Sequence, residues 1–266
     1  MSTKNYALVT GGTSGIGLEL AKLLAADHYN LAIVARNQQE LDQVGSDLSR
    51  QYPIEVITIR KDLFNPAAPR EIIDALKAKD IIIDVLINNA GQGVYGEFLD
   101  TDLDRELAIV QLNINACIIL TKHILKDMVA RNSGKILNVS SIAGKVPGPY
   151  QAVYHGTKAF VHFFSEAVRN EVSGTGVTIT SLLPGATDTD FFSKADMESA
   201  KIVQQGELAD PADVAKDGYT ALMEGKDMIV SGFKNKMQVA MSNVMTDSKA
   251  TDNMRKQQEP INKENQ

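Results

Sequence analysis

The sequence has little of what secreted or membrane-embedded proteins require. Its 266 residues contain one cysteine, Cys117, so no intramolecular disulfide can form and nothing indicates an oxidising compartment. The first residues lead into a strand-like segment without the apolar core of a signal peptide. No uninterrupted apolar run approaches the ~20 residues that a membrane-spanning helix needs. We therefore expect a cytoplasmic protein with no membrane contact, in which Cys117 is a buried thiol.

Basic residues are not in excess either. The chain has 27 Lys and Arg against 33 Asp and Glu, a net charge of −6, which argues against a nucleic acid as partner. Histidines with metal-ligand spacing relative to cysteines or carboxylates are also absent, so no metal is expected. What is present is a globular composition, because 44% apolar residues are enough to form a core.

Short apolar segments alternate with segments of helical periodicity along most of the chain. The apolar segments predict strands at 6–10, 31–35, 54–59, 85–87, 135–139, 177–183 and 227–230. The intervening segments predict helices at 15–26, 38–51, 67–79, 102–130, 154–172 and 211–223. This alternation predicts a single α/β domain: a Rossmann-like, doubly wound parallel sheet of about seven strands with helices on both faces.

The C-terminal residues differ in composition from the rest of the chain. We assign the catalytic domain to residues 1–245, because no interior change of composition indicates a second domain. Residues 246–266 are polar and are expected to form a flexible tail, with a terminal helix docking on a partner subunit as the alternative.

A glycine-rich turn joins the first predicted strand to the first predicted helix. Its glycines, Gly11, Gly15 and Gly17, have the spacing G-x-x-x-G-x-G. Glycines at this place let the backbone approach a pyrophosphate, whose charge the amides at the helix N-terminus stabilise. Thr13 and Ser14 lie inside the turn, where their hydroxyls could contact phosphate or cap the helix.

Arg36 follows the second predicted strand, where Rossmann-type proteins bind the adenine ribose. An acidic residue there would bind a free 2′-hydroxyl, whereas arginine offers a permanently charged donor set to a 2′-phosphate. NADP(H) is therefore favoured over NAD(H). The alternative is a solvated arginine that only begins the next helix.

Tyr154 and Lys158 are four residues apart near the start of a predicted helix, so their side chains project from one face. A free tyrosine, with a pKa of about 10, is a poor acid near neutrality. A nearby ammonium stabilises the phenolate, so Lys158 is expected to lower the pKa of Tyr154.

Six motifs occur in the order found in short-chain dehydrogenases/reductases, and the likeness covers about residues 5–230. They are Thr10-Gly11-x-x-x-Gly15-x-Gly17, Asn88-Asn89-Ala90-Gly91, Asn113, Ser140-Ser141, Tyr154-x-x-x-Lys158 and Pro184-Gly185-x-x-x-Thr189. The chain most resembles the bacterial NADP(H)-dependent group whose second strand ends in Ala-Arg. This resemblance implies an oxidoreductase that transfers hydride between a nicotinamide and a small-molecule carbonyl or secondary alcohol.

The resemblance also implies a role for each catalytic residue. Tyr154 would be the general acid in reduction and the general base in oxidation, and Lys158 would also bind the nicotinamide ribose. Ser141 would donate a hydrogen bond to the substrate oxygen. Asn113 would hold a water in a proton relay that reaches Lys158, with Asn115 as a competing candidate.

The cofactor implied by the resemblance is NADP(H), bound by loops at the strand ends. The residues expected to bind it are Gly11, Thr13, Ser14, Gly15, Ile16, Gly17, Arg36, Asn37, Asp62, Leu63, Asn89, Ala90, Gly91, Tyr154, Lys158, Pro184, Gly185, Thr187 and Thr189. Among them, Asp62 would lie by the adenine, and Pro184, Gly185 and Thr189 would meet the nicotinamide carboxamide.

Two segments are expected to border the substrate. The loop at 145–151 contains two prolines, and 188–206 contains apolar residues that predict either a lid over an apolar substrate or a surface helix. His155 follows Tyr154 directly and is expected to point away from the site.

Two other functions are compatible with the motifs. The first is a 3-oxoacyl-thioester reductase of the fatty-acid type, which would need a basic surface for a carrier protein. The second, from another class, is a non-catalytic NADP-sensing interaction protein, which would usually lack the tyrosine or lysine that this chain retains. The resemblance further implies a homodimer or homotetramer formed through the helices near 102–130 and 151–172.

Overall fold

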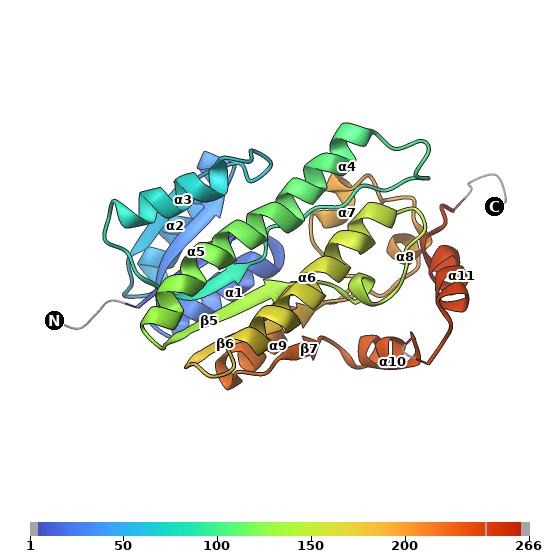
Figure 1. Cartoon of the computed structure of the whole chain (residues 1–266). Helices are drawn as coiled ribbons and strands as arrows, with labels where there is room; N and C mark the ends of the chain where they lie inside the picture. The colour runs from blue at the N-terminus through green and yellow to red at the C-terminus, as the bar shows by residue number, and fades with distance from the viewer. Residues whose placement is uncertain (1–4, 243, 262–266) are drawn as a thin grey trace.

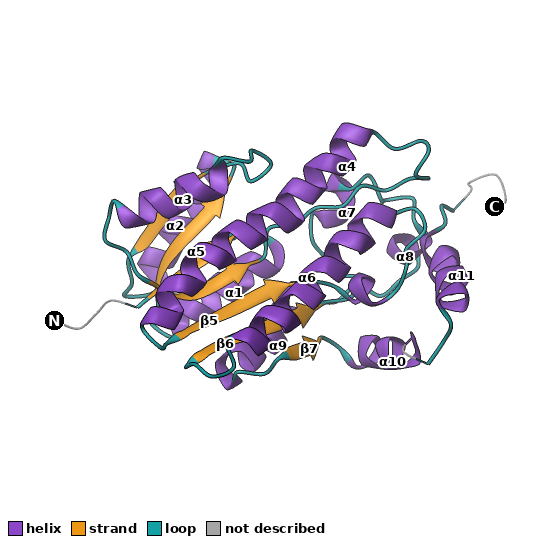
Figure 2. Cartoon of the chain, viewed as in Figure 1, coloured by secondary structure: helices purple, strands orange, loops and turns teal. Residues whose placement is uncertain are grey.

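The computed structural model describes residues 5–242 and 244–261, which contain one seven-stranded sheet of parallel strands (Figure 2). Its strands are β1 (Tyr6–Thr10), β2 (Asn30–Ala35), β3 (Val56–Arg60), β4 (Ile83–Asn88), β5 (Gly134–Val139), β6 (Val177–Leu183) and β7 (Met228–Val230). The order β3-β2-β1-β4-β5-β6-β7 places the change of winding direction between β1 and β4. The predicted doubly wound fold is confirmed.

Helices cover both faces of the sheet (Figure 1). One face carries α1 (Gly15–Ala26), α2 (Gln38–Gln51) and α9 (Pro211–Glu224). The other carries α3 (Ala68–Lys77), α4 (Leu103–Val110), α5 (Ala116–Ala130) and α6 (Ala152–Glu171). The remaining helical elements are η2 (Ile142–Lys145), α7 (Phe191–Lys194), α8 (Lys201–Gln204), α10 (Phe233–Ser242) and α11 (Asp247–Gln258).

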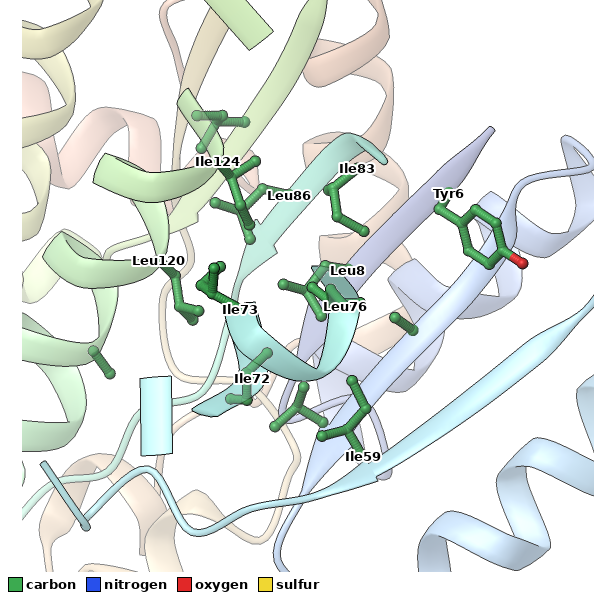
Figure 3. Close-up of a cluster of buried hydrophobic side chains, with 14 of the residues drawn as sticks. Tyr6, Leu8, Ile59, Ile72, Ile73, Leu76, Ile83, Leu86, Leu120 and Ile124 are labelled. Atoms are coloured by element: carbon green, nitrogen blue, oxygen red, sulfur yellow. The ribbon is translucent and has the colours of Figure 1, made fainter. Parts of the chain in front are cut away.

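The side chains of β1 alternate between the two cores. Leu8 packs in the cluster beneath α3 and α5, whereas Ala7 and Val9 belong to the cluster beneath α1 and α9. Figure 3 shows the first cluster, which contains Leu8 of β1, Ile72 of α3 and Leu120 of α5. Because both faces of the strand are buried, its sequence is a continuous apolar run rather than an alternating one.

The predicted helix over 102–130 is one helical run interrupted by a π turn, η1 (Gln111–Asn115), between α4 and α5 (Figure 1). The extra residue in a π turn shifts the helical register. Leu112 and Asn113 are the buried residues of this turn. Periodicity did not predict this turn, which brings Asn113 to the interior.

The same run, Leu103–Ala130, is long and apolar enough to cross a membrane when judged by length and composition, because a window of 18 residues within it has a mean hydropathy of 1.4. The sequence analysis considered only uninterrupted apolar runs and therefore underestimated how apolar this helical run is. In the fold, 44% of its most apolar window is buried, and α5 packs against α3, β4 and β5. A core helix passes such a test as readily as a membrane-spanning one.

The C-terminal tail differs from the expectation of flexibility. Residues Asp247–Gln258 form the helix α11, which buries Ala250 and Met254. These side chains are four residues apart and share one helical face, so a mostly polar sequence still has an apolar contact surface. The helix docks on its own subunit, near α8. The last part of the expected tail, 262–266, lies outside the described residues.

His162, on α6, lies inside the molecule and is 3% exposed. Its Nε2 atom is 2.5 Å from Nζ of Lys145, and its Nδ1 atom is 3.4 Å from Oγ of Ser181. Burial, reinforced by the charge of Lys145, lowers the pKa of His162 to about 4. The ring is therefore neutral in the folded protein at pH values where an unfolded chain would begin to protonate it.

This histidine makes the fold sensitive to acid. Between pH 6.5 and about 4 the unfolded chain binds the proton more readily, so stability falls as the pH falls, by ~2 kcal/mol at pH 5. We expect His162→Asn to reduce the loss of unfolding temperature between pH 7.5 and 5 by ~4 °C. His28→Asn is the control, because His28 is exposed and has a positive φ that asparagine tolerates. Equal losses in the two variants would contradict this assignment.

Candidate active site

A cleft of about 480 Å³ follows the carboxyl ends of the strands, where doubly wound sheets bind ligands. Loops after β1 to β6 contribute to its walls. Every residue that the sequence analysis assigned to a site lines this cleft except Gly17 and Asn113. Gly17 and Asn113 lie behind the wall. Gly17 packs against the Gly11 carbonyl, and Asn113 hydrogen-bonds with the backbone of Gln92.

The glycine turn has the conformation that its sequence predicts. Gly11 and Gly15 have φ values of 65° and 54°, which other residues rarely adopt. A Cβ atom on Gly17 would lie 2.2 Å from the carbonyl oxygen of Gly11, so only glycine lets α1 begin this close to the turn. Asn89 stabilises the turn by donating from Nδ2 to the carbonyl oxygens of Thr10 and Gly11, at 3.0 and 3.1 Å.

The residues of this turn fit a diphosphate group. Residues 13–16 line the cleft at the N-terminus of α1, a helix of 12 residues whose first turn contains no acidic residue. Unpaired amides at such an end attract anions. Ser14 is the N-cap, but its side chain makes no capping hydrogen bond. Thr13 instead donates from Oγ1 to Oε2 of Glu40 at 3.0 Å.

Arg36, at the end of β2, is exposed, and its guanidinium carbon lies 6.0 Å from the ring centre of Phe64. Among the residues that the structure describes, none forms a hydrogen bond or ion pair with Arg36, so its donors are available to a phosphate. Asn37 lines the cleft as well, but its Oδ1 accepts from the Gln39 amide and caps α2. Asn37 therefore positions the start of α2. This structural role adds to the cofactor contact that the sequence analysis expected of it.

Ser141, Tyr154 and Lys158 meet on one wall of the cleft. Tyr154 and Lys158 lie one turn apart on α6, with Nζ of Lys158 at 5.8 Å from the tyrosine ring centre. Lys158 donates from Nζ to the carbonyl oxygen of Val139 at 2.9 Å. Ser141 follows β5, where its Oγ accepts from the amide of Ala143 at 3.1 Å. The end of β5 thus holds both the serine and the lysine.

The pKa values of this group are governed by burial. Burial raises the pKa of Tyr154 to about 12, and a hydrogen bond with Ser141 offsets part of this rise. Burial also lowers the pKa of Lys158 to about 8. The expectation that Lys158 lowers the tyrosine pKa is therefore wrong for this arrangement, because loss of water outweighs an ammonium directed at Val139. Tyr154 is a protonated phenol at neutral pH, which is the form that donates a proton.

Asn113 lies behind the wall and is 3% exposed. Its Nδ2 donates to the carbonyl oxygen of Gln92 and to Oγ1 of Thr157, both at 2.9 Å, and its Oδ1 accepts from the Gln92 amide. With Lys158 it lines a small cavity of about 10 Å³, close to the minimum for one water. The competing candidate, Asn115, is exposed and bonds to Gln111 instead.

The other end of the cleft has apolar walls from the segment at 188–206. Phe191, Phe192, Met197 and Ile202 line it, and the Phe191 ring lies 5.1 Å from that of Tyr154. The segment folds as two short helices, α7 and α8, over the cleft. The segment therefore covers the site. This agrees with the prediction of a lid and not with that of a single surface helix.

Several lining residues were missed or misplaced by the sequence analysis. Met254 and Gln258 line the cleft but belong to no motif, whereas Gln151 ends the loop at 145–151 that was expected to border the substrate. His155 also lines it, although it was expected to point away from the site. The reason is that the end of α11 adds to the wall at this place, where Gln258 hydrogen-bonds to His155. The spacing of Ala250, Met254 and Gln258 was the sequence signal for this helix.

Metal binding and nucleophilic catalysis by a thiol would depend on other side chains of the chain. Within residues 5–242 and 244–261, no cluster of three or more His, Cys, Asp or Glu side chains has an arrangement that could hold a metal ion. Cys117 is buried, and burial raises the pKa of its thiol to about 11, so the thiolate is not available as a nucleophile.

A doubly wound sheet with a glycine turn and a Ser–Tyr–Lys group at its carboxyl edge defines a nucleotide-dependent oxidoreductase of the Rossmann type. The family model for short chain dehydrogenase matches residues 5–200. The chain belongs to this family.

Individual relatives agree with this assignment. The very-long-chain 3-oxoacyl-CoA reductase of Bos taurus is 39% identical over 185 residues, 67% of this chain and 58% of the relative. The chain thus matches little more than half the length of that relative. An uncharacterized oxidoreductase of Staphylococcus epidermidis is 30% identical over 78% of this chain and 88% of its own. A solved short-chain dehydrogenase from Sphingobium yanoikuyae, in complex with NADPH, has a TM-score of 0.81, 26% identity, and coverage of 91% of this chain and 96% of its own.

Proposed function

We propose that the chain is an NADP(H)-dependent reductase of small ketones. The observation that carries this proposal is the position of Tyr154, which lies with Ser141 and Lys158 on one wall of a cleft that extends from the glycine turn. Tyr154 donates its proton to the substrate oxygen, and Ser141 stabilises the charge that develops there by a hydrogen bond. The nicotinamide supplies the hydride. Lys158 and the residues of the glycine turn bind the nucleotide.

The available guanidinium of Arg36 supports NADP(H) over NAD(H). Among the described residues Arg36 has no negatively charged partner, and a 2′-phosphate would provide one. The solved relative that binds NADPH supports the same choice. Phe64, beside Arg36, offers an aromatic face to the adenine end of the cleft.

The direct test is a screen of ketones, aldehydes and 3-oxoacyl esters in which NADPH absorbance is followed. We expect oxidation of NADPH with at least one apolar ketone, and much slower oxidation of NADH. Binding of NADPH without turnover of any carbonyl compound would instead favour the non-catalytic NADP-sensing protein.

A 3-oxoacyl-thioester reductase is the second candidate. The 39% identity with a very-long-chain 3-oxoacyl-CoA reductase favours it, as do the apolar walls at the substrate end of the cleft. Faster turnover of 3-oxoacyl thioesters than of simple ketones would select this function. A cytoplasmic location and the absence of membrane contact remain predictions in either case.

We propose in addition that two copies of the chain pair through α4 and α6. These neighbouring helices expose large apolar side chains, with Leu103, Leu107 and Phe163 57–65% exposed. A second copy would bury this apolar surface, whose exposure to water is unfavourable. We expect Leu107→Asp with Phe163→Asp to halve the mass measured by light scattering. Met241→Asp, which changes a similarly exposed side chain on α10, is the control and should keep the mass of the parent.

A further inference from the structure

Hydrogen bonds link the C-terminal helix α11 to the catalytic helix α6 at the substrate end of the cleft. Nε2 of Gln258, in the last turn of α11, lies 2.9 Å from Nε2 of His155 and 3.4 Å from Oε1 of Gln151. All three side chains are buried, with 3–4% exposed. Tyr95 fixes the end of α11 by donating its hydroxyl to the Gln258 carbonyl oxygen at 2.6 Å.

The backbone determines which atom donates at each step. His155 Nδ1 lies 2.8 Å from the carbonyl oxygen of Val146, which can only accept, so Nδ1 carries the ring proton. Because burial lowers the pKa of His155, the ring is neutral and its Nε2 accepts. Gln258 therefore presents its amide nitrogen to His155. The second N–H of that nitrogen donates to Oε1 of Gln151.

This arrangement leaves one donor and one acceptor without partners. Nε2 of Gln151 and Oε1 of Gln258 are both buried and have no hydrogen-bond partner among the described residues. Each unpaired buried group is unfavourable, because it has lost its hydrogen bonds to water. Both residues line the cleft, so a molecule bound there lies beside the side chains that lack these hydrogen bonds.

The unpaired donor lies on the part of the cleft wall that also carries Phe191, the ring that packs on the catalytic tyrosine. A Cβ atom on Gly93 would be 3.1 Å from Nε2 of Gln151 and 2.9 Å from Cζ of Phe191, so both side chains approach Gly93. The Phe191 ring in turn packs 5.1 Å from the ring of Tyr154. A substrate whose carbonyl oxygen meets Tyr154 can therefore reach the amide pair with a group a few bonds away.

We propose that Gln151 and Gln258 form a second polar subsite, which binds a hydroxyl group of the ketone substrate. A hydroxyl oxygen can accept from Nε2 of Gln151 while its proton is donated to Oε1 of Gln258. A keto, ether or thioester oxygen has no proton to donate, and a carboxylate would place its charge against Oε1. The proposal rests on the proposed function and narrows its substrates to hydroxyketones with an apolar body.

The experiment compares methyl hexyl ketone with its monohydroxylated derivatives, which differ only in the position of the hydroxyl group. We expect at least one derivative to have a kcat/KM about 10-fold above that of the parent ketone. In Gln151→Met and Gln258→Met this preference should fall to about twofold or less, because methionine keeps the size but not the hydrogen bonds. Gln205→Met, at an exposed position, is the matched control and should keep the full preference.

Binding of the same ketones without nucleotide, followed by ligand-observed NMR, separates the subsite from the reaction. Absence of turnover with every ketone would overturn the proposed function, while a binding preference for a hydroxyketone that both methionine variants lose would still support the subsite. Equal binding of the parent and all derivatives would overturn the subsite and leave water as its only occupant. If a thermal melt shows that Gln258→Met is not folded, Gln151→Met decides the question alone, because Gln151 lies outside α11.

Discussion

Tyr154→Phe is expected to lower kcat/KM for ketone reduction by at least ~10³-fold, with nearly unchanged affinity for NADPH. The substitution removes one oxygen, and with it the only proton that the phenol can donate to the substrate. The ring keeps its contacts with Phe191 and Lys158, so the walls of the cleft stay in place. Turnover is measured by NADPH absorbance and affinity by calorimetric titration.

Two comparisons make this result specific to the proton. Tyr52→Phe removes a hydroxyl at the end of α2, far along the chain from α6, and should keep full activity. Ser141→Ala should reduce turnover less than Tyr154→Phe, because it removes a hydrogen bond to the oxygen but leaves the proton donor. Activity of Tyr154→Phe within tenfold of the parent would rule out Tyr154 as the acid.

The fold could be predicted from the sequence because both faces of the central strands are buried. Residues 6–10 and 31–35 are short apolar runs that a parallel sheet covered by helices requires, and they correspond to β1 and β2. The π turn at Gln111–Asn115 could not be predicted in this way. Apolar spacing continues smoothly across it, and only contacts with the rest of the fold stabilise the shifted register.

The nucleotide end of the site was likewise predictable, since its residues are fixed by backbone demands. Gly17 has to be glycine because a Cβ atom would collide with the Gly11 carbonyl, and such demands leave a spaced motif. The substrate end was predictable only in part, because the segments at 145–151 and 188–206 were expected to border the substrate but the C-terminal helix was not. Gln151 and Gln258 are 107 positions apart and meet only because the end of α11 lies beside the start of α6.

The pKa of Tyr154 shows where reasoning from spacing alone fails. Four-residue spacing correctly places Lys158 on the same wall, and an ammonium does favour a phenolate. The spacing carries no information on burial, however, and burial raises the tyrosine pKa to about 12. A lysine directed at the Val139 carbonyl does not offset that loss of water.

Arg36→Asp is expected to reverse the preference between the two nucleotides. An aspartate at this position can accept from a free 2′-hydroxyl, whereas its charge repels a 2′-phosphate. Removing the guanidinium also removes a charge-assisted hydrogen bond, so the ratio of kcat/KM for NADPH to that for NADH should fall by ~10²–10³-fold. Arg36 contributes no ion pair or hydrogen bond to the described fold, so the unfolding temperature should be nearly unchanged.

Arg60→Asp is the matched control, since Arg60 ends the neighbouring strand β3, is exposed and does not line the cleft. It makes the same change of charge one strand away and should leave the nucleotide ratio within about threefold of the parent. Glu40 gives a second check, because its carboxylate, bonded to Thr13 and Asn37, already lies on this wall. Glu40→Gln should raise affinity for NADPH modestly by removing a negative charge near the phosphate. If Arg36→Asp and Arg60→Asp shift the ratio equally, net charge rather than a 2′-phosphate contact sets the preference, and Arg36 is only a solvated residue at the start of α2.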